Sequence, residues 1–379
     1  MIDEYRRRLR GDLESPADAR RFGRGWLSGV AALVLAFACL GSVLCLKYPD
    51  VLSVPEMRKA IDLTLFRIAL HVALLLAFML ALVSVVLREN RVLGLTAVTV
   101  VLVATALGGS RATSAGELTS GMYLGLDWFM LNLTFTGLVF VPLERVFGRR
   151  PQPLFRTEWR EDLFYFLLSS LMVQGLTYLS LAPSLAIAAH TQWAGFRATV
   201  GSQPLWLQVL EIMFLTDLVQ YWVHRAFHRN AFLWRFHAVH HSAPTLDWLA
   251  GSRMHVIEIV VLRGTTVIPM YVLGFQQPAL YVYLLFVYVY ATYIHSNVRF
   301  DVEWLKPVIV TPRFHHWHHG IEREAVDVNF AIHFPVIDRV FGTYYMPPGR
   351  WPSGYGVSSE PVPHGFLRQF FFPFARRGV

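Results

Sequence analysis

Three histidine groups decide the fold: His224-Arg-Ala-Phe-His228, His237-Ala-Val-His240-His241 and His315-His316-Trp-His318-His319. With the isolated His255 and His295, they hold eleven of the fifteen histidines in this 379-residue chain. The second and third groups share the spacing H-x-x-H-H.

Each group has the spacing of one helix face, because residues three and four apart lie on the same side of an α-helix. Imidazole binds zinc, copper, iron and nickel, and a mononuclear zinc site needs only three or four protein ligands. Eight or more clustered imidazoles therefore predict two metal ions close together. One H-x-x-x-H motif alone is more often a surface or core pair, but three neighbouring groups favour metal.

The composition is that of a membrane protein: 54% hydrophobic residues, 16% charged residues and a mean hydropathy of +0.41. Apolar runs that predict membrane spans occupy residues 26–46, 68–87, 92–109, 122–143, 163–182, 205–223, 256–274 and 279–294. The short connection between the last two runs predicts an antiparallel hairpin, which returns His255 and His295 to one side. The predicted fold class is all-α, a polytopic membrane bundle whose cytoplasmic-face helical cap carries a histidine-rich dimetal site.

Positive charges orient this bundle. Seven arginines between residues 6 and 24 place the N-terminal tail in the cytoplasm. With that start, the arginine-rich loop of residues 145–160 and all three histidine groups fall on the cytoplasmic side, whereas the loop with Lys47, Arg58 and Lys59 fits less well. We attribute the net charge of +8 to anchoring at anionic headgroups, not to nucleic-acid binding.

The sequence predicts three regions. Residues 1–150 form an N-terminal tail and about four transmembrane helices, and residues 151–350 form the catalytic domain with the histidine groups. Residues 351–379 form a C-terminal tail, where Phe370-Phe-Phe-Pro-Phe374 precedes Arg376 and Arg377. This aromatic and basic composition suits an interfacial anchor.

An acid precedes the first histidine group on the same predicted helix face. Asp217, Tyr221, His224 and His228 follow one another at steps of four, three and four residues. A metal-bound histidine usually donates its second N–H to a carboxylate or carbonyl, so we predict that Asp217 orients a ligand. The alternative is a salt bridge to an arginine elsewhere in the chain.

A second acid lies at the start of the predicted hairpin. Glu258 comes three residues after His255, so both are predicted to face the histidine cluster. The alternative for Glu258 is a salt bridge to Arg253 or Arg263.

Missing motifs narrow the chemistry. The chain has no H-E-x-x-H, no E-x-x-H pair, no G-x-S-x-G and no phosphate-binding loop. What remains is a histidine-rich bimetallic centre beside the bilayer, where a lipid is the natural substrate. Iron there would activate O₂, whereas zinc would favour a membrane hydrolase. A metal transporter would need ligands near the membrane midplane, and these cluster at one surface.

In this order, the three groups resemble those of the fatty acid hydroxylase and sterol desaturase superfamily of membrane di-iron oxygenases. Arg253-x-His255-x-x-Glu258 and His295-x-Asn297 are similar to its intervening signals. Asp338-Arg-x-Phe-Gly-Thr343 is similar to its closing segment. The resemblance covers residues 155–346.

The resemblance implies two iron ions, O₂ as co-substrate, and hydroxylation or desaturation of a sterol, fatty acyl chain or polar lipid. The implied ligands are His224, His228, His237, His240, His241, His315, His318 and His319, with His255 and His295 as additions. Asp217, Glu258 and Asn297 are implied site residues, and His316 is left out of the ligands. Only two cysteines occur, so electrons are expected from a separate ferredoxin, haem protein or reductase.

Overall fold

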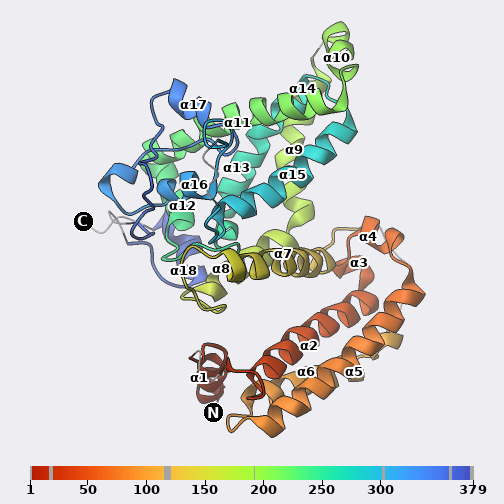
Figure 1. Cartoon of the computed structure of the whole chain (residues 1–379). Helices are drawn as coiled ribbons and strands as arrows, with labels where there is room; N and C mark the ends of the chain where they lie inside the picture. Colours follow the sequence, from red (N-terminus) through yellow and green to blue (C-terminus); the bar gives the residue numbers. More distant parts are fainter. Residues whose placement is uncertain are drawn as a thin grey trace. The chain divides into compact units, whose positions relative to one another are not determined.

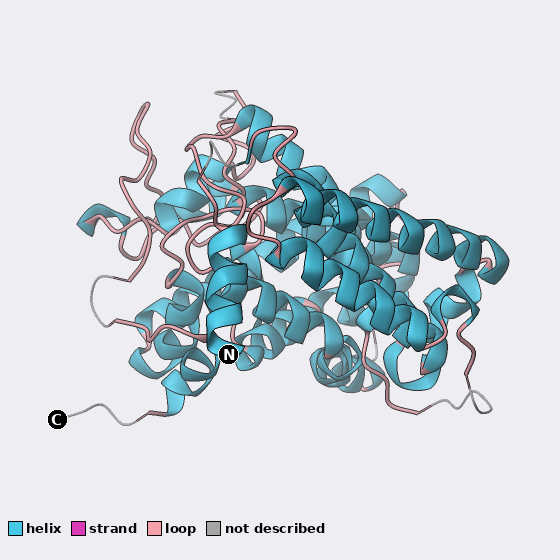
Figure 2. Cartoon of the chain, turned by 90° about the horizontal axis from the view of Figure 1, so that it is seen from below, coloured by secondary structure: helices cyan, strands magenta, loops and turns pink. Residues whose placement is uncertain are grey.

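The computed structural model describes residues 2–16, 20–114, 121–191, 193–300, 304–357 and 361–375. In these ranges the chain forms helices and two isolated β-bridges, Gly148–Val298 and Gly320–Tyr355, and no strand (Figure 2). The all-α prediction is confirmed. Arg376 and Arg377 of the predicted interfacial tail lie outside the described residues.

Within the described ranges, five helical segments are long and apolar enough to cross a membrane: Trp26–Lys47, Leu63–Leu87, Val92–Arg111, Leu126–Phe147 and Gln277–His295. A sixth span arises if α8 (Trp159–Leu171) and α9 (Val173–Ala189), bent by 65°, count as one broken span. These helices overlap six of the predicted apolar runs. The chain is therefore a multi-pass membrane protein.

The chain divides into two compact units, of which the first comprises residues 1–134, 153–155 and 170–174. Its helices are α1 (Ile2–Leu13), α2 (Trp26–Lys47), α3 (Pro49–Leu52), α4 (Pro55–Ala60), α5 (Leu63–Leu87) and α6 (Val92–Ala106). The long helices α2, α5 and α6 pack against one another (Figure 1). Fully buried alanines, among them Ala36, Ala77 and Ala97, let these backbones approach closely. Helix α7 (Leu126–Phe147) begins in this unit and ends in the second.

The second unit, residues 135–152, 156–169 and 175–379, carries the histidines. Besides most of α8 and α9, its helices are α10 (Ala194–Gly201), α11 (Leu205–Arg229), α12 (Ala231–His241), α13 (Val256–Thr266), α14 (Ile268–Val272), α15 (Gln277–His295), α16 (Pro312–His318), α17 (Pro335–Val340) and α18 (Phe366–Phe371). Helix α11 packs against α12, α13, α14 and α15 (Figure 1). It is the central scaffold of this unit.

Two predicted spans differ from the helices observed. The run at 205–223 is the first part of α11, which continues through the first histidine group to Arg229. The run at 256–274 is broken into α13 and α14 around Val267, where Pro269 occupies the first turn of the new helix. Proline has no N–H to continue a helix, which explains the break.

Local sequence signals place the histidine helices. Asn230 ends α11 and begins α12, where its side-chain oxygen accepts hydrogen bonds from the N–H groups of Phe232 and Leu233. This cap begins α12 directly after α11, between the first two histidine groups. Helix α16 begins at Pro312 after an N-cap by Thr311.

Candidate metal centre

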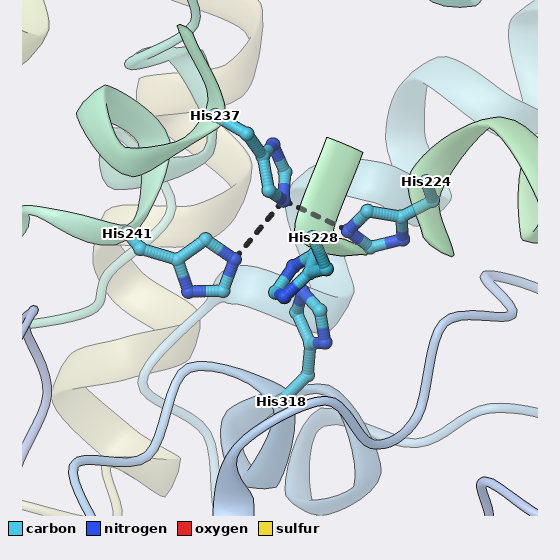
Figure 3. A group of neighbouring side chains, drawn as sticks. All are labelled: His224, His228, His237, His241 and His318. Atoms are coloured by element: carbon cyan, nitrogen blue, oxygen red, sulfur yellow. Dashed lines mark hydrogen bonds between the residues drawn. The ribbon is translucent and has the colours of Figure 1, made fainter. Parts of the chain in front are cut away.

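Nine of the ten predicted ligands come together in two groups. The five-histidine group is His224, His228, His237, His241 and His318. The four-histidine group is His240, His295, His315 and His319. In each group, one ring nitrogen of every residue lies within 4.8 Å of those of the others. Figure 3 shows the five rings of the first group turned toward a common space.

Each H-x-x-H-H sequence is divided between the two groups. On α12, His237 and His241 belong to the five-histidine group, and His240 belongs to the other. In the third sequence, His315 and His319 belong to the four-histidine group, and His318 belongs to the other. In each H-x-x-H-H sequence, the two histidines four residues apart therefore face one candidate metal position. The third histidine faces the other candidate position.

The Nε2 atoms converge at distances that suit a shared ion. Nε2 of His237 lies 2.9 Å from Nε2 of His224 and 3.0 Å from Nε2 of His241 (Figure 3). In the other group, Nε2 of His315 lies 2.9 Å from that of His295 and 3.1 Å from that of His319. Two nitrogens bound at right angles to one ion at about 2.1 Å would be about 3.0 Å apart.

Two further Nε2 atoms have no partner of their own. Those of His228 and His318 are buried and have no hydrogen-bond partner in the part of the chain that the structure describes. An unsatisfied buried polar atom is costly, and a metal ion at the centre of the five-histidine group would satisfy both. The residues present therefore fit a metal ion on the chemistry of their donor atoms.

Four of the five histidines in this group have a partner on their outward Nδ1 atom. Two of these partners are backbone carbonyls: Nδ1 of His224 lies 2.9 Å from Phe330 O, and Nδ1 of His318 lies 2.8 Å from Val328 O. The other two are carboxylates: Nδ1 of His237 lies 2.5 Å from Glu258 Oε1, and Nδ1 of His228 lies 3.4 Å from Asp327 Oδ1. Each partner accepts a proton, so Nδ1 is the protonated nitrogen and Nε2 keeps its lone pair for a metal. Such outer partners are typical of metal-ligating histidines.

The four-histidine group has outer partners of its own. Nδ1 of His240 donates to the backbone carbonyl of Arg253 at 3.0 Å, and Nδ1 of His295 donates to that of Ala291 at 2.7 Å. Both carbonyls again leave Nε2 pointing inward. The two groups are thus oriented by separate parts of the chain.

Burial keeps the imidazoles neutral. It lowers the pKa well below the usual value for His237, His240, His241, His315, His318 and His319. Neighbouring imidazoles lower each pKa further, because their charges would repel. Neutral imidazole is the form that binds a metal.

The two groups are immediate neighbours. The rings of His241 and His319, one from each group, stack with centroids 4.4 Å apart. The rings of His315 and His318 are also stacked, at 5.5 Å. Two ions bound here would share one buried compartment, and the occupancy by two metals stays a prediction.

The remaining predicted ligand, His255, lies outside both groups. Its Nδ1 accepts a hydrogen bond from the N–H of Ile257 and so caps α13, while Nε2 donates to the carbonyl of Phe370 at 3.0 Å. Both ring nitrogens are therefore engaged with backbone. This geometry does not support a ligand role for His255.

Glu258 faces the cluster, as predicted. Its carboxylate contacts His237, whereas Arg253 pairs instead with Glu158 and Asp162. Glu258 is thus a carboxylate placed to orient His237.

Asp217 acts through a loop. Its carboxylate accepts hydrogen bonds from the N–H groups of Ile332, His333 and Phe334 at 2.7–3.1 Å. No hydrogen bond from Asp217 to a histidine ring or an arginine occurs among the described residues. Asp217 therefore fixes the segment whose Phe330 carbonyl orients His224. It acts on that histidine through the backbone, whereas the sequence predicted a direct contact.

Asn297 also supports the site from outside. Its side chain exchanges hydrogen bonds with the backbone N–H and C=O of Arg150, and its own N–H donates to Glu144. It ties the end of α15, which carries His295, to the segment after α7. It belongs to neither histidine group.

Several supporting groups were not predicted from the sequence. Asp338 accepts hydrogen bonds from the N–H groups of Phe330 and Ala331, and Asp327 pairs with His228. The backbone carbonyls of Arg253 and Val328 carry no sequence signal. Asp327 and Asp338 both lie in polar stretches after the third histidine group. That position in the sequence was the signal that could have indicated a supporting role.

The fold and the site define a class: a helical membrane protein with two adjoining groups of histidines that could each hold a metal ion. Comparison with known proteins shows that residues 209–343 match the fatty acid hydroxylase family model. All nine grouped histidines lie within the matched residues.

Similar proteins include the ornithine lipid hydroxylase OlsE of Rhizobium tropici, 31% identical over 46% of this chain and 53% of that protein. The alkylglycerol monooxygenase of Homo sapiens is 30% identical over 34% of this chain and 28% of that protein. A putative methylsterol monooxygenase of Dictyostelium discoideum is 26% identical over 60% of this chain and 84% of that protein. The chain thus spans about half or less of the first two relatives. No solved structure matches it.

Proposed function

We propose that this protein is a membrane-bound di-iron oxygenase that hydroxylates a lipid with O₂ and externally supplied electrons. The observation that carries the proposal is the pair of adjoining histidine groups with inward Nε2 atoms. The names of the relatives, which are hydroxylases and monooxygenases, favour hydroxylation over desaturation. Nothing among the matched proteins supports the alternative of a zinc-dependent hydrolase.

The chain's own residues prepare the site. Bound iron would supply the activation of O₂ and the oxidation of an unactivated C–H bond. Glu258 keeps the proton of His237 on Nδ1, and the Phe330 carbonyl does the same for His224. The surrounding burial excludes bulk water, and the apolar helices would hold the hydrocarbon body of the lipid.

The overall reaction consumes two electrons and two protons with each O₂, so that the substrate C–H becomes C–OH and the other oxygen atom becomes water. The chain has two cysteines, Cys39 and Cys45, too few for a four-cysteine iron–sulfur cluster. We therefore propose a separate donor protein: a ferredoxin, a haem protein or a reductase. The positive-inside pattern favours its approach from the cytoplasm.

The first test is the metal content of the detergent-purified protein beside the double variant His240→Ala/His241→Ala, which removes one imidazole from each group. We expect about two irons per chain, largely lost in the variant and retained in the control His190→Ala, whose residue is exposed. Iron-loaded protein should consume O₂ when lipid and reductant are present. Mass spectrometry of host lipids should show a product with one added oxygen atom.

Two results would contradict the proposal. One is freshly prepared, folded protein without any metal. The other is zinc that iron cannot replace with a gain of O₂ consumption, which would favour the hydrolase.

A further inference from the structure

A buried ionic network adjoins the four-histidine group. Its members are Arg156, Glu158, Asp162, Asp247 and Arg253. Arg253 and Asp162 are completely inaccessible to solvent. Burying charges is costly, and it is tolerated where the pairs are well formed and fix one specific arrangement. We therefore expect this network to fix one specific part of the site.

Asp162 joins the two arginines. One carboxylate oxygen accepts a hydrogen bond from Nε of Arg253, and the other accepts one from Nη2 of Arg156. Arg253 also donates a hydrogen bond to Glu158 Oε2 at 2.7 Å. Arg156 donates two hydrogen bonds to the Asp247 carboxylate, at 2.6 and 2.7 Å. The Arg253 guanidinium is therefore held at more than one point.

The same residue orients a predicted ligand through its backbone. The Arg253 carbonyl accepts the Nδ1 proton of His240 at 3.0 Å. Asp247 caps the preceding turn by accepting hydrogen bonds from the N–H groups of Leu249 and Ala250. Hydrogen bonds of the Asp247 and Arg253 side chains thus fix both ends of this segment. The Arg253 carbonyl is therefore held in one orientation, toward His240.

The five-histidine group does not depend on this fastening. There His237 is oriented by Glu258, and His224 and His318 are oriented by carbonyls of the segment after α16. None of these partners forms a hydrogen bond or ion pair with the network among the described residues. A disturbance of the network should therefore reach one metal position and spare the other.

We propose that Arg253 is a positioning residue specific to the four-histidine group: its side chain, held by Asp162 and Glu158, fixes the carbonyl that orients His240. The inference rests on the proposed two-metal function. It also explains the first residue of Arg253-x-His255-x-x-Glu258. The motif holds one histidine of each group from outside and caps α13 between them.

The test uses full-length protein loaded with cobalt, whose visible spectrum reports its ligands. His240→Ala and His228→Ala serve as references with the four- and the five-histidine group impaired, respectively. Arg253→Met and Asp162→Asn should lower the cobalt content from about two to about one per chain. The spectrum that remains should match that of His240→Ala. In the double variant Arg253→Met/His240→Ala, no further cobalt should be lost, because both changes act on one contact.

Arg235→Met is the matched control. Arg235 lies on α12 and donates to the carbonyls of Phe372 and Pro373, so its loss should leave both cobalt ions in place. If Arg253→Met fails to fold, as judged by gel filtration, Asp162→Asn decides.

The inference is overturned if Arg253→Met and Asp162→Asn retain both cobalt ions or lose both equally. It is also overturned if their remaining spectrum matches that of His228→Ala. Wild-type protein without metal would instead refute the proposed function itself. The two failures are therefore distinguishable.

Discussion

Glu258 Oε1 lies 2.5 Å from Nδ1 of His237, and both side chains are buried. This pair links the first turn of α13 to α12. Because the carboxylate accepts the Nδ1 proton, the lone pair on Nε2 points toward His224 and His241. A carboxylate behind an imidazole also raises its basicity as a ligand.

Replacing Glu258 by Gln should weaken metal binding selectively. The amide oxygen can still accept a hydrogen bond, but its charge is lost. We expect the affinity of the five-histidine group to fall about 10- to 100-fold and that of the four-histidine group to stay unchanged, as measured by titration against a chelator. The control is Glu211→Gln, on α11, whose carboxylate contacts Gln203. Equal weakening of both groups would contradict the assignment.

Replacing His255 by Ala should spare the metals. The change removes the cap of α13 and the hydrogen bond to Phe370, so the C-terminal segment around α18 should become more susceptible to proteolysis. Metal analysis and limited proteolysis of one preparation would check both effects. Loss of one metal ion from folded protein would instead restore His255 as a ligand.

The neighbours His315 and His316 should behave differently. His316 contacts Tyr355 through Nδ1 and the Ser296 carbonyl through Nε2, whereas Nε2 of His315 faces His295 and His319. His316→Gln should therefore retain both metals, and His315→Gln should lose about one per chain. Metal content measured side by side decides, and a similar loss in both variants would show that His316 is a ligand.

His333 should make stability sensitive to acid. Burial lowers its pKa to about 3, and its Nδ1 has no hydrogen-bond partner among the residues that the structure describes. The pKa in the unfolded chain is about 6.5, so on acidification the unfolded state takes up this proton first. The contribution of His333 to stability is complete above about pH 6.5. Below that pH it is lost at about 1.4 kcal/mol per pH unit, until the pH reaches the folded-state value.

The measurement for His333 is thermal unfolding in detergent between about pH 7 and 5. His333→Gln should show a shallower decline than the wild type, and His190→Gln, at an exposed position, should follow the wild type. Parallel curves for His333→Gln and wild type would show that His333 is already protonated or accessible in the folded protein.

The sequence predicted the helices and the nine clustered histidines because both depend on local periodicity. Spacings of three and four residues place side chains on one helix face, whatever the helix packs against. The same rule could not predict that His240 and His241 serve different groups. That division depends on how α11, α12, α15 and α16 pack together, which no single helix encodes.

The partners of Asp217 illustrate the other limit. Its helix face was predicted correctly, but the three N–H groups that it accepts belong to residues 332–334, which have no helical period. Arg253 was noticed as part of a motif, yet its contact with His240 passes through a backbone carbonyl. Every residue has such a carbonyl, so side-chain identity could not reveal this one.

The division of the ligands over α11, α12, α15 and α16 has a consequence for biosynthesis. Five of the nine histidines leave the ribosome before α15 exists, and both groups stay incomplete until His318 and His319 emerge. A nascent chain therefore displays a partial imidazole cluster, and imidazole binds copper and zinc as well as iron. If the protein is the proposed di-iron oxygenase, we expect the iron supply during expression to govern the yield of correctly metallated protein.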